Sequence, residues 1–172
     1  IIEIKDGGIG MIRITDNGSG IPEDDVLSAF MRHATSKIRS MDDLENVLTL
    51  GFRGEALSSI ASVSQMEMIT KPRDQYMAKR IELHGGKLIG DSMIGAADGT
   101  TIVMRHLFYN TPAMRKFPKN AGTESSHVSD IVNRNILGQP ELAFKYTLTK
   151  SEIVNTNGHR KLKTDQFSVY GK

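Results

Sequence analysis

The chain has 172 residues, enough to bury a hydrophobic core, and this length favours one domain with at most the edge of another. The net charge of +2 permits DNA or an acidic substrate but does not indicate either, and the apolar fraction of 38% is ordinary for a globular protein. Because there is no cysteine, disulfides, thiolate metal sites and cysteine nucleophiles are excluded, and no stretch approaches the ~18 apolar residues of a membrane span.

The first predicted elements are the two strands of a hairpin. Ile2 and Ile4 alternate with charged residues, Ile12 and Ile14 do the same, and the turn-forming residues 6–8 lie between them. A chain that starts directly inside such an alternation is expected to be a fragment of a longer protein.

Three short helices are predicted next. The first begins near Pro22 and carries apolar residues at helical spacing through Ala34. The second follows a capping box at Ser40 and Asp43. The third follows Gly54 and contains Leu57, Ile60 and Ala61.

The remaining pattern is mostly strands. A strand is predicted around residues 66–68, a hairpin turn at Gly85-Gly86 and a further strand over 100–105. A helix with its apolar stripe on Val128, Ile131, Val132 and Ile136 ends at Gly138, a strand covers 142–148, and Asn157-Gly158 gives a turn.

This mixture of helices and hairpin-linked strands predicts an α/β (α+β) two-layer sandwich with helices on one sheet face. We expect one domain over 1–160. Residues 161–172 would be a linker and the first strand of a second domain, because Phe167, Val169 and Gly171 alternate.

The segment Asp16-Asn17-Gly18-Ser19-Gly20 follows the second strand. A partly buried carboxylate at Asp16 needs hydrogen-bond donors, and the exocyclic amine of adenine is a suitable one. Gly18 and Gly20 lack a Cβ, so a flat ring can approach the backbone closely. A simple Asn-Gly turn after the strand is the alternative interpretation of this segment.

The segment Gly51-Phe52-Arg53-Gly54-Glu55-Ala56-Leu57 precedes the third helix. Glycines three apart, leading into a helix N-terminus, can present several N–H groups to a phosphate. A glycine-lined loop before a core helix is the alternative interpretation. It is not a Walker A loop, because the G-K-[ST] ending is missing.

Two further segments are candidates for the same site. Lys37 can reach phosphates from a mobile segment, although a single lysine is usually just solvated. The hydroxyl of Thr100 or Thr101, on the strand over 100–105, can share the adenine contact. Thr111 before Pro112 has the pattern of a helix N-cap, which is a structural role.

In order and spacing, these segments resemble the GHKL (Bergerat) class of ATP-binding folds. GFRGEALSSIASV and LFYNTPAMRKF further resemble the ATPase domain of MutL-type DNA mismatch repair proteins. The resemblance runs from about residue 1 to residue 140, is most specific between 12 and 63, and is weaker beyond 141. Met114 departs from it, because the family usually has arginine there.

The resemblance implies an ATP-binding set of residues in this chain. Asp16 would hold adenine above Gly18 and Gly20, and Thr100 or Thr101 would support that contact. The phosphates would be enclosed by Lys37 and by the backbone of Gly51, Arg53, Gly54, Glu55, Ala56 and Leu57.

The resemblance also implies what these 172 residues lack. In the family, a helix upstream of the first strand carries the general-base glutamate and the asparagine that ligates Mg²⁺. Both would lie before Ile1, so no catalytic or metal-binding residue is assigned here. We expect the chain alone to bind ATP weakly and not to hydrolyse it.

For the longer protein the resemblance implies ATP-driven pairing into a homodimer, DNA binding without sequence specificity, a MutS-type mismatch-recognition partner and the bacterial cytoplasm. One alternative is a DNA- or partner-binding module with incidental nucleotide binding, based on the basic residues Arg115, Lys116, Lys119, Arg160, Lys161 and Lys163. The other is the ATPase domain of a topoisomerase or a chaperone, against which the GFRGEAL segment argues.

Overall fold

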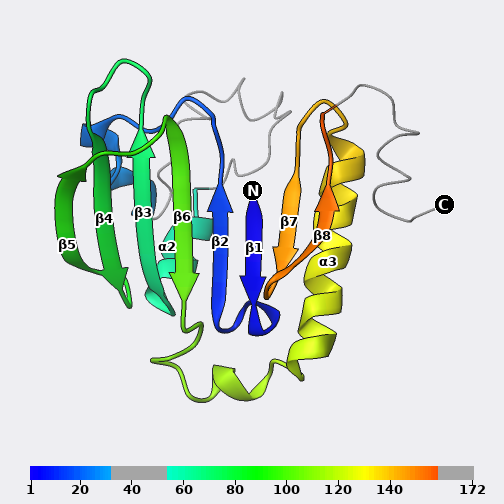
Figure 1. The fold of residues 1–172 in the computed structure, drawn as a ribbon. Coiled ribbons are helices and arrows are strands. Elements are labelled where there is room, and N and C mark those ends of the chain that lie inside the picture. Colours follow the sequence, from blue (N-terminus) through cyan, green and yellow to red (C-terminus); the bar gives the residue numbers. More distant parts are fainter. Residues whose placement is uncertain (32–53, 159–172) are drawn as a thin grey trace, which may run out of the picture. The chain divides into compact units, whose positions relative to one another are not determined.

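The computed structural model of the protein describes residues 1–31 and 54–158 (Figure 1). The chain divides into two compact units, one made of residues 1–16 and 102–172 and the other of residues 17–101. Strand β6 (Gly99–Arg105) passes from the second unit into the first after Thr101. The predicted second helix, near Ser40, lies outside the described residues.

In the first unit, the strand order is β6-β2-β1-β7-β8. Strand β1 pairs antiparallel with β2 and parallel with β7, and β7 pairs antiparallel with β8. The predicted N-terminal hairpin is confirmed, with Ile2 opposite Ile14 and Ile4 opposite Ile12. The elements are β1 (Ile2–Lys5), η1 (Asp6–Gly8), β2 (Met11–Thr15), η4 (Met114–Lys116), α3 (Ala121–Gly138), β7 (Lys145–Leu148) and β8 (Ser151–Asn155).

The core of this unit lies where α3 packs on β1, β7 and β8 (Figure 1). It contains Ile4, Val132, Ile136, Tyr146 and Val154. The spacing of Val132 and Ile136 puts both on one helix face, since residues four apart lie one above the other. A sheet covered by a helix in this way is the predicted two-layer arrangement.

One residue of the predicted stripe was placed wrongly. Ile131 is 60% exposed, whereas Val132 and Ile136 are buried. The buried face follows the i, i+4 row that also contains the partly buried Val128, and Ile131 lies beside that row.

The turn η1 packs against the start of α3. Gly7 has φ 65°, and a Cβ built there would lie 2.7 Å from Glu124 Cβ and 2.9 Å from the Ala121 carbonyl oxygen. Only glycine therefore permits this approach of the hairpin turn to the helix.

In the second unit, the strand order is β5-β4-β3-β6. Both pairs among β3, β4 and β5 are antiparallel, and the predicted turn at Gly85-Gly86 is confirmed, with φ of 58° and 79°. The elements are η2 (Glu23–Asp25), η3 (Ser28–Phe30), α2 (Ala56–Ser62), β3 (Gln65–Lys71), β4 (Ala78–His84) and β5 (Lys87–Ile94).

The helix predicted to begin at Pro22 differs in the described residues. The chain forms two separate 3₁₀ turns, η2 and η3, up to Phe30. Val26 is fully buried between them, while Leu27 is 40% and Met31 60% exposed. Burial of a single apolar side chain does not require the continuous stripe that an α-helix would present.

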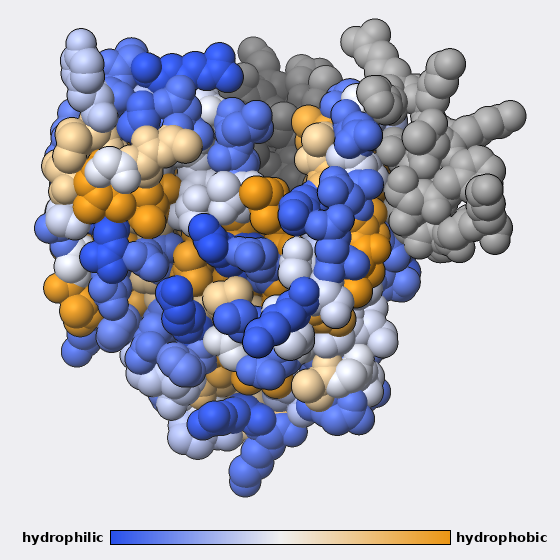
Figure 2. Space-filling view, in the orientation of Figure 1, coloured by the Kyte–Doolittle hydropathy of each residue, from blue (hydrophilic) through white to orange (hydrophobic). Residues whose placement is uncertain are grey.

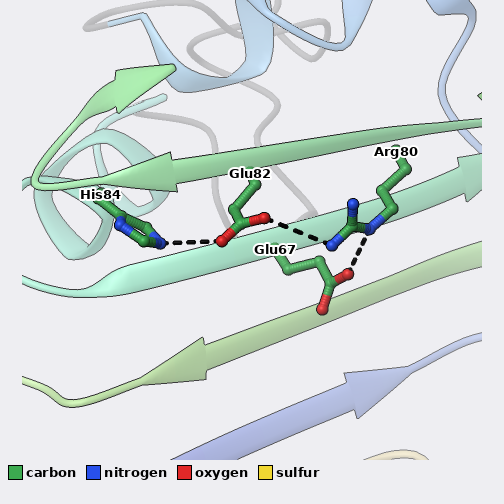
Figure 3. Close-up of polar contacts among 4 residues, drawn as sticks. All are labelled: Glu67, Arg80, Glu82 and His84. Carbon is green, nitrogen blue, oxygen red and sulfur yellow. Dashed lines mark hydrogen bonds and ion pairs between the residues drawn. The ribbon is translucent and has the colours of Figure 1, made fainter. Parts of the chain in front are cut away.

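Strands β3 and β4 have one apolar and one polar face. The buried side chains of Met66, Met68, Ile81 and Leu83 belong to the apolar face. The other face carries an ion-pair cluster of Glu67, Arg80, Glu82 and His84, drawn in Figure 3.

This ion-pair cluster places a positively charged side chain between two negatively charged ones. Glu67 and Glu82 are cross-strand partners, and like charges in that position repel. The Arg80 guanidinium lies between them, with Nε 2.6 Å from Glu67 Oε1 and Nη2 3.4 Å from Glu82 Oε2. The hydrogen bond to Glu67, followed by its charge, raises the pKa of Arg80. The cluster is structural and stabilises the polar face.

The predicted strand over 142–148 starts later, at Lys145, because Leu142 N–H bonds the Gln139 carbonyl in a turn that follows α3. Thr149, with φ 59°, forms the hairpin turn into β8. Asn157-Gly158 follows β8, and Gly158 has φ 67°.

Hydrophobic side chains reach the surface in Figure 2 at several places separated by hydrophilic ones. The exposed ones include Leu88 and Ile89 of β5 and Phe117, which is 81% exposed. Among the described residues, no helix combines the length and the hydropathy that a membrane span requires.

Candidate functional site

Asp16 directly follows β2, at the end of the first unit. The sequence predicted a partly buried carboxylate, but the residue is exposed, as are Asn17, Gly18 and Ser19 after it. The β1–β2 ladder ends at Thr15, whose N–H bonds the Ile1 carbonyl oxygen, directly before Asp16.

Gly20, in the second unit, is held against the end of β3. Its φ is 71°, and a Cβ built there would lie 2.6 Å from the backbone nitrogen of Pro72 and closer still to the carbonyl oxygen of Lys71. The requirement for glycine at this position is therefore steric as well as conformational. Gly18, two residues earlier, is exposed.

The residue after Gly20 is fixed by a buried threonine that the sequence analysis did not identify. Ile21 N–H donates to Thr70 Oγ1 at 2.9 Å. The same hydroxyl lies 2.9 Å from Thr100 Oγ1 and 3.3 Å from the Gly99 carbonyl oxygen. Thr70 is 1% exposed. The structure thus connects the glycine loop with Thr100 within one unit.

A signal for Thr70 was present in the sequence. Met66, Met68 and Thr70 alternate in β3 and are all buried, so Thr70 is a polar residue at an apolar position of the pattern. A buried hydroxyl must be hydrogen-bonded, which made this position a candidate for a specific contact. Thr101, the neighbour of Thr100 in β6, is half-buried.

The predicted phosphate-binding segment is described only from Gly54 onward. Gly54 has φ 62°, and Glu55 lies at the N-cap position of α2. The Glu55 carbonyl oxygen accepts hydrogen bonds from Ser59 N–H at 3.1 Å and from the Ser58 hydroxyl at 3.0 Å. Ala56 and Leu57 form the first turn of the helix.

The remaining predicted phosphate contacts, Lys37, Gly51 and Arg53, lie outside the described residues. Helix α2 packs against η3 and β4. The described part of the segment is thus a glycine followed by a helix start, as the sequence predicted, and the structure adds that this glycine has a positive φ.

The lysines of β3 and β4 are already paired with carboxylates. Lys71 Nζ lies 2.5 Å from Asp98, and Lys79 Nζ lies 2.6 Å from Asp91 and 3.0 Å from Glu23. Hydrogen bonds to Asp91 and then to Glu23 raise the pKa of Lys79. These two lysines therefore stabilise the second unit and are not available cations for a phosphate.

Within residues 1–31 and 54–158, no three His, Cys, Asp or Glu side chains come together in a way that could hold a metal ion. Glu23 forms an ion pair with Lys79.

The segment LFYNTPA, in the first unit, does not form the predicted N-cap. The Thr111 carbonyl oxygen accepts from Met114 N–H and Arg115 N–H, while the buried Thr111 hydroxyl has no hydrogen-bond partner among the described residues. The helix that follows is the single 3₁₀ turn η4, and its N-cap position is Ala113.

No family model matches the chain. It is 48% identical over 171 residues to the DNA mismatch repair protein MutL of Agathobacter rectalis and 46% identical over 170 residues to that of Acidobacterium capsulatum, covering 99% of this chain in each case. The chain spans about a quarter of these relatives, 26% of each.

A solved structure gives the same result for the fold. The Aquifex aeolicus MutL ATPase domain complexed with ADP is 28% identical, with a TM-score of 0.77, and the match covers 98% of this chain and 59% of that one. The predicted fold class is confirmed by this match. Sequence and fold agree: the chain is a MutL-type sequence that matches the ATPase domain of these DNA mismatch repair proteins.

Proposed function

We propose that the chain binds adenine nucleotides as part of a MutL-type ATPase. The observation that carries this proposal is the connection of Ile21, directly after the D-x-G-x-G segment, to Thr100 through the buried Thr70 hydroxyl. It gives a fixed pair of elements to which a base can bind. The similarity to an ATPase domain complexed with ADP supports the choice of nucleotide.

Asp16 is assigned the base contact, in which its carboxylate accepts a hydrogen bond from the exocyclic amine of adenine. Gly18 and Gly20 lie beneath the ring. The hydroxyl of Thr100 or Thr101 supports the same contact, directly or through water.

The phosphate contacts belong to the GFRGEAL segment and Lys37. In this proposal the phosphates are bound by the backbone N–H groups of Gly51, Arg53, Gly54, Glu55, Ala56 and Leu57, since N–H groups at a helix start have no acceptor within the helix. This segment is the ATP lid of the proposal.

Hydrolysis requires a carboxylate within hydrogen-bond reach of the attacking water. Among the described glutamates, Glu23 is paired with Lys79, and no metal-binding group of side chains is present in the described ranges. We expect the 172 residues by themselves to bind ATP weakly and without turnover, because none of the residues assigned above has the role of a general base. Mg²⁺ would be held by an asparagine that none of the assigned residues supplies.

In the longer protein, ATP orders the lid and favours pairing of two such domains, and hydrolysis releases them. A MutS-type protein and DNA are the proposed partners, and the cytoplasm of a bacterium is the proposed location. Exposed Arg115 and Lys116 are candidate DNA contacts. If they neutralise DNA phosphates, replacing both with glutamine reduces the salt dependence of binding.

The decisive experiment is a calorimetric titration of a non-hydrolysable ATP analogue with Mg²⁺ into the chain and into Asp16→Ala. We expect binding that Asp16→Ala abolishes, and Asp25→Ala as the matched control should bind as the unchanged chain does. Equal binding by the chain and by Asp16→Ala would contradict the assigned adenine contact. Hydrogen exchange tests the lid, since ATP should protect residues 32–57.

A further inference from the structure

We propose that Thr70 is a positioning residue of this nucleotide site, which fixes the backbone after Gly20 and the side chain of Thr100 in one arrangement. Thr70 contacts both elements, yet it lies in β3, outside every motif that predicted the site. The inference rests on the proposed function, because it names a residue that acts through the proposed adenine contacts.

The bonding capacity of the Thr70 hydroxyl is fully used. A hydroxyl offers one hydrogen and two acceptor lone pairs. Ile21 N–H takes one lone pair at 2.9 Å. The hydrogen and the second lone pair are shared between Thr100 Oγ1 at 2.9 Å and the Gly99 carbonyl oxygen at 3.3 Å. No part of the hydroxyl is left for another role.

Water cannot replace this hydroxyl without a change in packing. Thr70 is 1% exposed, and it continues the buried row of Met66 and Met68. Valine has nearly the same shape and would continue that apolar row. It would, however, leave the Ile21 N–H without its acceptor and the Thr100 hydroxyl without this partner.

The backbone around Gly20 and Ile21, to which Thr70 is hydrogen-bonded, has little conformational freedom. Gly20, with φ 71°, already lies against the Lys71–Pro72 backbone, directly after Thr70 in the chain. The loop and Thr100 are 49 and 30 residues from Thr70 in sequence, so one side chain sets the distance between two remote segments. A base that contacts both requires this distance to be kept.

The test compares Thr70→Val with a matched control in the first unit. Thr156 is 4% exposed, and its hydroxyl accepts Phe144 N–H at 3.0 Å, so Thr156→Val also removes a buried acceptor of one backbone N–H. ADP is titrated into each protein and followed by NMR, which measures weak as well as tight binding. Thermal unfolding of each protein is recorded in parallel.

We expect both valine variants to lower the melting temperature. Only Thr70→Val should weaken ADP binding, by about tenfold, as expected for one hydrogen bond. Thr70→Ser keeps the hydroxyl and should restore affinity. In a Thr100→Val background, Thr70→Val should cause little further loss, since a residue that acts through another is not additive with it.

In the unchanged chain, ADP should slow hydrogen exchange of the Ile21 amide but not of the Phe144 amide. This measurement tests the inference even if Thr70→Val does not fold. Any one of three results would overturn the inference and leave the proposed function intact. These are equal effects of ADP on the two amides, unchanged ADP affinity in Thr70→Val, and fully additive losses of affinity with Thr100→Val. If the unchanged chain binds no ADP, the proposed function fails and the inference fails with it.

Discussion

At the scale of single residues, buried threonine hydroxyls differ in the hydrogen bonds that they form. The hydroxyls of Thr70 and Thr156 each accept a backbone N–H from a residue far away in sequence. Within the described part of the chain, the buried hydroxyl of Thr111 has no hydrogen-bond partner. The residue type therefore indicates which hydrogen bonds a side chain can form, and its neighbours in the fold determine which of them it does form.

Gly20→Ala should destabilise the chain by about 1–3 kcal/mol, because alanine is strained at φ 71° and its Cβ would meet the Lys71–Pro72 backbone. Gly95→Ala is the control, since nothing lies within 4 Å of a Cβ there. Urea unfolding of the two variants measures the difference. Similar losses in both would show that the contact with Lys71 is not restrictive.

The pH dependence of stability can be tested at Glu152. A hydrogen bond from Lys145, and then one from Asn155, lowers the pKa of Glu152 from 4.5. A lowered folded-state pKa contributes stability that is present above pH 4.5 and is lost as the pH falls through the folded value.

Glu152→Gln should therefore lower the melting temperature slightly at pH 7 and less below pH 4, with a small effect throughout because the pair is exposed. Melting curves from pH 7 to pH 3 measure this change. Glu141→Gln, at an exposed position with no ion pair among the described residues, is the control. A constant difference at all pH values would rule out the Lys145 contact as the cause.

At the scale of elements, helix α3 is stabilised at its N-terminus, where the sequence motifs predicted no cap. The Asn120 side chain caps α3 by accepting Thr123 N–H at 2.9 Å and the Thr123 hydroxyl at 3.1 Å. Glu124 reaches back to Lys119 N–H at 2.8 Å. The helix ends at Gly138 as predicted, but Gly138 does not have a positive φ, so the end is not a left-handed glycine cap.

Asn120→Ala should cost about 1 kcal/mol, because two donors at the start of α3 lose their acceptor. Asn120→Asp keeps an acceptor oxygen and adds a charge that suits a helix N-terminus, so it should retain most of the stability. Guanidinium unfolding compares the two variants. Equal losses would mean that the side-chain cap adds nothing to the packing of α3.

At the scale of the whole molecule, ligand binding and stability are linked. If adenine nucleotide binds only the folded chain, ADP at 100 times its dissociation constant should raise the free energy of unfolding by about 2.7 kcal/mol. Thermal unfolding across an ADP series measures this, and Asp16→Ala should show no shift. A shift of the same size with inorganic phosphate alone would assign the effect to anion binding.

Local patterns determined much of this protein. The N-terminal hairpin, the turn at Gly85-Gly86, the position of α3 and the identity of the motifs could all be read from neighbouring residues. Period-two alternation and helical spacing specify which face of an element is apolar. The contiguous segments DNGSG, GFRGEAL and LFYNTPA were sufficient for the resemblance that the comparisons confirm.

Only the tertiary structure decided which faces meet. It left Ile131 exposed, divided the helix after Pro22 into two 3₁₀ turns, paired β1 parallel to β7, and brought Ile21 and Thr100 to the hydroxyl of Thr70. The physical reason is that the periodicity of apolar residues specifies which face of an element is buried, but not the element against which that face packs. A hydrogen bond across 49 residues depends on the register and packing of strands, which no local pattern contains.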